Sequence, residues 1–331
     1  RHATTILDRQ RAARRILLIL SDGKPNDLDL YDGRYGIEDT VDELGLAIVE
    51  KGLGHVDPFA DRGGDRREIR GESCAKCTTG GGLQGSQAAS VKRAVMDADA
   101  VVNLVGSFAN MDAVQNIGAG IVAQAAADAG VGALVHISAI GADPHSDAEY
   151  GQSKASGEAA VHAAFPIAVI LRPSIVFGRE DQFINRFAGM IRSLPVVPVI
   201  GADTKFQPVF VGDVAKAVAK AVAHQDGSTL ELGGPEIFSM MELNRWIAKA
   251  IGRDPIFVEV PDIAAKLLAK GTGWLPGAPI TEDQYKMLGK DNVVTGTDGL
   301  AAYGIVPTPL DTIAADWLNI YRRHGRFGGS Q

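Results

Sequence analysis

The chain has 331 residues, of which 46% are hydrophobic, and its formal net charge is -7. This length and composition fit one large α/β domain, or a domain with a smaller lobe, and the acidic balance argues against nucleic-acid binding. The two cysteines, Cys74 and Cys77, are too few for a secreted disulfide framework. Because the sequence holds neither a membrane-spanning apolar run nor a signal-peptide pattern, we expect a cytoplasmic protein or one peripheral on a membrane's cytoplasmic face.

The first ninety residues are the least regular part of the sequence. Residues 16–20 predict a strand and residues 37–51 a helix, and these define an atypical strand-helix unit over 1–60. A second strand at 56–60 is interrupted by a proline. Residues 61–87 show little hydrophobic periodicity, so we expect an irregular loop over 61–90.

A dinucleotide-binding fold needs a glycine-rich turn directly after its first strand. Only Gly23 stands there, and three acidic residues that would repel phosphate surround it: Asp22, Asp27 and Asp29. A formal G-x-G-x-x-G occurs at Gly80, Gly82 and Gly85, but it follows no strand and indicates loop composition. Cys74 and Cys77 have metal-ligand spacing without a second pair, so no metal site is predicted.

From residue 98 onward, apolar strands alternate with helical stretches, which is typical of a parallel sheet covered by helices. The expected strands are 100–105, 133–138, 168–176 and 229–232. The expected helices are 112–129, 150–164, 215–224 and 239–251, the last with a capping box formed by Ser239 and Glu242. The pattern predicts an α/β, Rossmann-like, doubly wound parallel sheet over 91–235. The proline-interrupted remainder, 236–331, predicts a small, irregular C-terminal lobe.

Tyr150 and Lys154 lie four residues apart at the start of an expected helix, and therefore share one face of it. An ammonium group beside a phenol lowers the pKa of the phenol, as a proton donor requires. Ser138 ends the preceding apolar strand and could hold a substrate oxygen. The order Ser138, Tyr150, Lys154 resembles the active site of the short-chain dehydrogenase/reductase superfamily. The structural alternative is a packed, helix-capping tyrosine and a solvated lysine.

Several further motifs extend this resemblance over residues 94–317. They are Asp99 to Gly106, Leu134 to Ser138, Tyr150 to Glu158, Leu171 to Phe183, Gln207 to Val214, Glu231 to Glu236, Thr281 to Gln284 and Lys290 to Val294. Together they resemble the NAD(P)H-binding accessory subunit of respiratory complex I, an atypical short-chain dehydrogenase family. The resemblance implies that the cofactor is bordered by Asn103, Leu104, Val105, Gly106, Lys154, Pro173, Ser174 and Ile175.

The N-terminal segment departs from that family. Residues 16–40 resemble the late strand and helix of a von Willebrand A domain, as in the nitric oxide reductase activation protein. Asp22 would match the last ligand of a metal-ion adhesion site, but the Asp-x-Ser-x-Ser of such sites is absent, so we expect no Mg²⁺ site. The fragment is a strand plus a helix, and could dock on the sheet in place of the family's first unit without restoring phosphate binding.

These observations leave several functions open. The first is an NAD(P)-binding protein that serves the assembly or stability of complex I at the cytoplasmic face of the inner membrane. NADPH is the favoured cofactor. The atypical N-terminal segment could impair its binding. The second is an active NAD(P)-dependent reductase or epimerase that uses Tyr150, Lys154 and Ser138. A third is recruitment of an ATPase by the von Willebrand A-like segment.

Other features receive structural interpretations. His136 is expected to be a hydrogen-bonded core residue, and Arg179, Glu180 and Asp181 a loop ion-pair cluster or a border of the substrate cleft. Residues 264–275 could touch a membrane or a partner subunit, although packing in the lobe is the simpler interpretation.

Overall fold

The computed structural model describes residues 17–21, 47–50, 83–108, 110–272 and 280–323. They fall into two compact units, the first drawn from 1–138, 153–171 and 218–229, and the second from 139–152, 172–217 and 230–331. Several predictions lie outside the described residues: the strand at 56–60, the loop up to residue 82, and the roles of Asp22, Asp27, Asp29, Cys74, Cys77, Gly80 and Gly82.

A six-stranded sheet in the order β10-β5-β4-β3-β1-β2 forms the first unit, and β5 and β10 run on into the second. The strands are β1 (Leu17–Ser21), β2 (Ala47–Glu50), β3 (Ala100–Asn103), β4 (Ala133–Ile137), β5 (Val169–Pro173) and β10 (Thr229–Leu232). The pairings from β2 through β5 are all parallel. All four residues of β3 are buried, as in a parallel strand that is covered on both faces.

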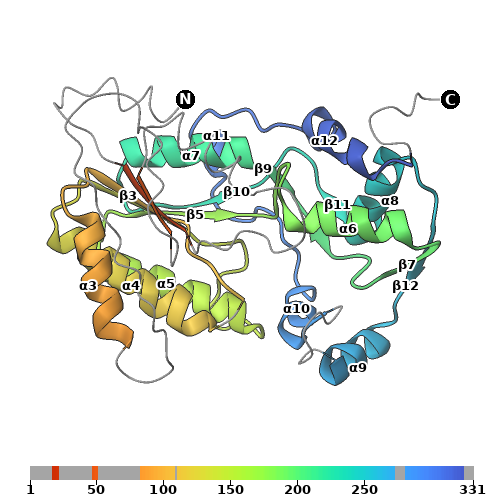
Figure 1. The fold of residues 1–331 in the computed structure, drawn as a ribbon, viewed down its shortest axis with the longest axis horizontal. Coiled ribbons are helices and arrows are strands. Elements are labelled where there is room, and N and C mark those ends of the chain that lie inside the picture. The colour runs from red at the N-terminus through yellow and green to blue at the C-terminus, as the bar shows by residue number, and fades with distance from the viewer. Residues whose placement is uncertain (1–16, 22–46, 51–82, 109, 273–279, 324–331) are drawn as a thin grey trace. The chain divides into compact units, whose positions relative to one another are not determined.

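Helices cover this sheet on both sides (Figure 1). They are α3 (Leu83–Val95), the π-helix η1 (Asp112–Ile117), α4 (Gly118–Asp128), α5 (Glu149–Ala164) and α7 (Val211–Ala223). Figure 1 shows α3, α4 and most of α5 on one face and the C-terminal half of α7 on the other. Val101 and Leu134 of the sheet pack with Ala123 and Val161 of the helices and with Phe165 just after α5, which places the core of the unit between these layers.

The second unit contains several helices, three of which pack around one core, and several short strand pairs. The helices are α6 (Gln182–Ser193), α8 (Met240–Ala250), α9 (Asp262–Thr272), α10 (Glu282–Met287), α11 (Gly299–Ala302), α12 (Leu310–Leu318) and the 3₁₀ turn η2 (Asn319–Tyr321). The strands are β6 (Val176–Phe177), β7 (Val196–Val199), β8 (Lys205–Phe206), β9 (Val209–Phe210), β11 (Phe238–Ser239) and β12 (Ile256–Glu259). Ile184, Leu243, Ile247, Trp317 and Leu318 join α6, α8 and α12 in one core.

Most of the elements predicted after residue 98 are confirmed. The strand at 133–138 corresponds to β4, the helix at 150–164 to α5, and the helix at 239–251 to α8 with its Ser239–Glu242 capping box. The predicted first strand is β1, and it docks beside β3 as expected for the fragment. Three boundaries differ by two residues or more. The strand expected over 100–105 ends at Asn103, the strand expected to end at 176 stops at Pro173 before a separate β6, and α7 begins four residues before its predicted start at 215.

Three predictions of secondary structure were wrong. Residues 47–50 form β2 rather than the end of a helix, because the β-branched pair Ile48 and Val49 pairs in register with β1. Residues 83–90, expected to be irregular, belong to α3, whose sequence lacks proline and is rich in Ala, Gln, Lys and Arg. The C-terminal lobe is not irregular, because Pro261 and Pro309 precede α9 and α12, where a missing amide costs nothing.

Candidate functional site

The carboxyl end of β3 carries a buried amide that shapes the segment after it. Asn103 Nδ2 donates to Nδ1 of His136, its register partner on β4, over 3.1 Å. Asn103 Oδ1 accepts a hydrogen bond from Val105 N, also over 3.1 Å, which turns the chain across the strand end. Since Nδ1 of His136 accepts, its proton lies on Nε2, and burial lowers its pKa to about 3. The prediction of a hydrogen-bonded core histidine is confirmed.

Lys154 meets this turn from helix α5. Its Nζ donates to the carbonyl of Ile137, the last residue of β4, over 3.2 Å. A Cβ placed on Gly106 would lie 3.7 Å from the same nitrogen, so the glycine leaves the space beside the ammonium group open. Lys154 is 4% exposed, and burial lowers its pKa to about 8 against the opposing effect of Glu158. The structure therefore brings Asn103, Gly106 and Lys154 together, while Leu104 is exposed.

Two buried polar atoms on β4 and its extension have no hydrogen-bond partner among the described residues: Nε2 of His136 and Oγ of Ser138. The amide of Ser138 still continues the sheet, donating to Leu171 O over 2.8 Å. Residues two apart on a strand point to the same face, so the two side chains lie on one side of β4 and its extension. Leaving a buried polar atom unpaired costs about 1–3 kcal/mol, which a bound ligand or water would offset. The donor set around this strand end therefore fits a dinucleotide, which binds at the carboxyl ends of parallel strands.

Tyr150 belongs to the second unit and occupies the first turn of α5. Its spacing puts it on the face that carries Lys154. Burial raises the pKa of Tyr150 to about 12, which opposes the lowering expected from Lys154. The amides of Glu149 and Tyr150 donate to the carboxylate of Asp283 in α10, over 2.6 and 3.2 Å.

Asn292 forms hydrogen bonds with the predicted nicotinamide border at Pro173, Ser174 and Ile175. The hydroxyl of Ser174 lies 2.7 Å from Asn292 Oδ1, which also accepts from Ile175 N over 3.1 Å. Asn292 Nδ2 donates to Ile140 O over 3.4 Å. The Ser174 hydroxyl thus serves the fold, and so do the amides of Ser174 and Ile175 and the carbonyls of Pro173 and Ile175, which are hydrogen-bonded within the protein.

Sequence reasoning missed the parts of Asp283 and Asn292. Both stand inside motifs that supported the resemblance, Thr281 to Gln284 and Lys290 to Val294, but their partners lie more than a hundred residues away. The only signal for these roles in the sequence was that an Asp and an Asn stand within short polar motifs of the C-terminal lobe.

Asp181 caps α6, accepting from Ile184 N over 2.6 Å. Burial raises the pKa of Asp181 to about 6 in spite of this and other backbone hydrogen bonds. This N-cap role of Asp181 is structural, and it differs from both interpretations of Arg179, Glu180 and Asp181, the ion-pair cluster and the cleft border, which stay predictions.

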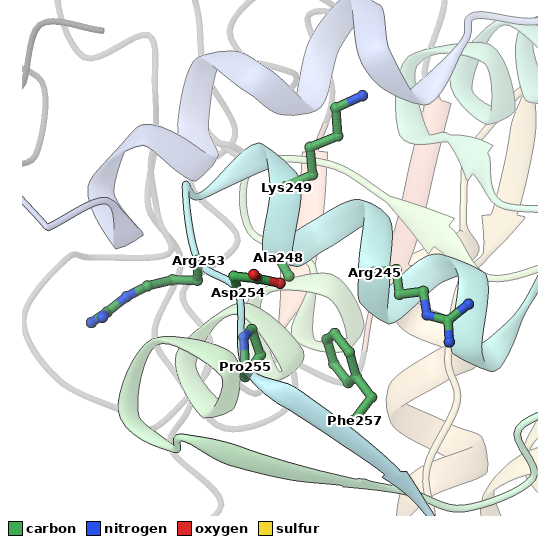
Figure 2. Close-up of a pocket in the computed structure, with 7 residues that line it drawn as sticks. All are labelled: Arg245, Ala248, Lys249, Arg253, Asp254, Pro255 and Phe257. Atoms are coloured by element: carbon green, nitrogen blue, oxygen red, sulfur yellow. The ribbon is translucent and has the colours of Figure 1, made fainter. Parts of the chain in front are cut away.

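A hollow of about 470 Å³ opens beside the C-terminal end of α8 and the start of β12 (Figure 2). Arg245, Lys249 and Arg253 line it, and Figure 2 shows these three cationic side chains pointing away from one another. None of the predicted site residues lines this hollow, and the diverging cations do not form an anion site.

Across the described part of the chain, no helix has the length and apolarity needed to span a membrane. The same residues contain no cluster of three side chains suited to a metal ion.

Solved structures define the class of protein by its fold. The chain superimposes on dTDP-4-dehydrorhamnose reductase of Bacillus anthracis, solved with NADP, with a TM-score of 0.59 and 15% identity over 93% of this chain and 99% of that one. WbmH of Bordetella bronchiseptica, solved with NAD⁺, gives a TM-score of 0.56 and 17% identity over 94% and 100%. Residues 107–269 match the RmlD substrate binding domain. The fold is that of the Rossmann NAD(P)-binding reductases, as predicted.

Sequence relatives are more specific. Subunit 9 of the NADH dehydrogenase (ubiquinone) 1 alpha subcomplex from Rattus norvegicus is 35% identical over 247 residues, which cover 71% of this chain and 64% of the rat protein. The chain therefore spans less than two thirds of that relative. Protein NorD of Stutzerimonas stutzeri is 60% identical over 40 residues, 12% of this chain and 6% of that protein. Both resemblances predicted from the sequence are confirmed: the chain is homologous to a complex I subunit and carries a short NorD-like segment.

Proposed function

We propose that the chain is an NAD(P)-binding, atypical short-chain dehydrogenase-like protein with an accessory role in the assembly or stability of respiratory complex I. The homology to subunit 9 supports the partner. The observation that carries cofactor binding is the arrangement at the ends of β3 and β4. There the buried ammonium of Lys154 lies beside Gly106, and Ser138 Oγ is buried without a partner among the described residues.

In this proposal each residue has a defined task. Lys154 would donate to the ribose hydroxyls, and the turn from Asn103 to Gly106 would border the dinucleotide. Pro173, Ser174 and Ile175 would border the nicotinamide. NAD(P)H, when bound, supplies a hydride, but an accessory role requires only that it stabilise the fold, as any ligand of the native state does. We favour NADPH over NADH on the family resemblance.

Helix α9 supports a peripheral position at the inner membrane. Ile263 is 76% exposed and Leu267 67% exposed, one helical turn apart, and the exposed Lys266 and Lys270 accompany them. Apolar side chains flanked by lysines are suited to an anionic membrane surface. The sequence interpretation of residues 264–275 as packed within the lobe holds for Ala265 and Ala269, which are buried.

The accessory role is tested in the source organism by tagging the chain and separating membrane complexes under native conditions. We expect the chain to comigrate with complex I, and its deletion to lower the amount of assembled complex. Migration apart from complex I, with unchanged assembly after deletion, would contradict the role.

A reductase or epimerase is the second candidate, because Ser138, Tyr150 and Lys154 are all present and Ser138 Oγ has no hydrogen-bond partner among the described residues. Tyr150 would be the acid/base and Ser138 would polarise the substrate oxygen. NADPH oxidation with a panel of quinones and keto-sugars, compared between the unaltered chain and Tyr150→Phe, tests this function. Turnover that survives the substitution would dismiss Tyr150.

A further inference from the structure

Helix α5 is capped by a residue from a distant part of the sequence. The first amides of a helix have no partner within the helix. In α5, Glu149 N donates to Oδ1 of Asp283 over 2.6 Å and Tyr150 N to Oδ2 over 3.2 Å. A carboxylate is also the group that the positive end of the helix dipole favours. One side chain thus holds the backbone of the turn that carries Tyr150.

Asp283 is itself held in place by helix α10. Thr281 and Gln284 form a reciprocal capping box around it, with bonds of 3.1 and 3.2 Å. The Tyr285 hydroxyl donates to Oδ1 of Asp262 in α9 over 2.6 Å, and Thr204 Oγ1 donates to Leu288 O over 2.6 Å. These contacts fix α10 at both ends, so the carboxylate meets α5 in a preset orientation.

Lys154 has separate support. Lys154 lies one helical turn after the capped end of α5, and its Nζ donates to Ile137 O. Loss of the cap would therefore loosen the turn that carries Tyr150 and leave the anchor of Lys154 intact.

We propose that Asp283 is a positioning residue for Tyr150, and that it sets the start of α5 through its two backbone hydrogen bonds. This inference rests on the proposed function for its importance, because Tyr150 matters only if a ligand meets it. The contacts themselves are independent of any cofactor.

The test compares Asp283→Ala and Asp283→Asn with Glu282→Ala and Glu282→Gln. Glu282 is the matched control, because it stands beside Asp283 in the same turn and pairs only with Lys286, at 3.5 Å, among the described residues. Each protein is labelled with 3-fluorotyrosine, and the Tyr150 signal is assigned by Tyr150→Phe. Fluorine NMR then follows the ionisation of this ring, hydrogen exchange follows the amides of residues 149 and 150, and calorimetry measures NADPH binding.

We expect Asp283→Ala to speed exchange at both amides by about tenfold or more and to lower the pKa of Tyr150, because the loosened turn exposes the phenol. Asp283→Asn, which keeps an acceptor oxygen, should have a smaller effect, and the Glu282 variants none. The dissociation constant for NADPH should stay within about threefold throughout, since Lys154 keeps its anchor.

An unchanged Tyr150 ionisation and unchanged exchange in both Asp283 variants would overturn the inference, as would a lower melting temperature without any change at Tyr150. If Asp283→Ala does not fold, Asp283→Asn against Glu282→Gln decides the question. Failure of the unaltered chain to bind NADPH would contradict the proposed function, while the Tyr150 readouts would still decide the role of Asp283.

Discussion

The buried histidine at the end of β4 should make the protein sensitive to mild acid. His136 is 1% exposed, and burial, with a smaller effect from Lys154, lowers its pKa from 6.5 to about 3. In the unfolded chain His136 binds a proton below about pH 6.5, whereas in the folded chain it binds one only below about pH 3. The free energy of unfolding therefore falls as the pH drops from 6.5 to 3. At about 1.4 kcal/mol per pKa unit, the whole loss is on the order of 5 kcal/mol, of which about 2 kcal/mol is lost by pH 5.

Urea unfolding followed by circular dichroism at pH 7.5 and pH 5 measures this loss. His136→Asn keeps an acceptor near the position of Nδ1 but cannot titrate, so it should lose about 2 kcal/mol less than the unaltered chain over the same interval. His145, which is exposed, provides the control, and His145→Asn should behave as the unaltered chain does. Equal losses in His136→Asn and the unaltered chain would refute the neutral, buried histidine.

Three further predictions follow from packing and charge. Gly157→Ala should destabilise the chain by about 1–3 kcal/mol, because a Cβ there would overlap the carbonyl of Gln115, whereas Gly271→Ala, with open space around it, should not; equal melting temperatures would contradict this. Asp213→Asn should cost about 1–3 kcal/mol in urea unfolding, because the carboxylate is fully buried and accepts two hydrogen bonds. NADPH affinity measured by calorimetry should fall as the pH rises through about 8, where Lys154 loses its proton, and Lys154→Arg should remove this dependence; a flat profile in the unaltered chain would argue against a cationic contact.

The fold was predictable where the hydrophobic pattern and the signals for the ends of helices and strands agree. Continuous apolar runs predicted β3 and β4, and the Ser239–Glu242 pattern predicted the start of α8. The helices of the C-terminal lobe could not be predicted from its prolines alone, because a proline can end an element or, like Pro261 and Pro309, stand just before a helix. The two-residue strands β8 and β11 depend on pairing with each other, which no local pattern shows.

The site was predictable as a set of residue types and less so as a set of contacts. The resemblance selected Asn103, Gly106 and Lys154, which the structure brings together. It did not reveal Asp283 or Asn292, because their roles arise from long-range hydrogen bonds. The pKa of Tyr150 could not be predicted from its spacing to Lys154, because burial decides it.

Cofactor binding by the whole chain tests the central claim most directly. Calorimetric titration with NADPH and NADH, on the unaltered chain and on Lys154→Met, measures it without assuming a reaction. We predict saturable binding below millimolar concentration, tighter for NADPH, and at least about tenfold weaker in Lys154→Met, the effect of losing one charge-assisted hydrogen bond. Absence of binding at millimolar NADPH and NADH would contradict the account and show that the strand ends of β3 and β4 do not hold a dinucleotide in this chain.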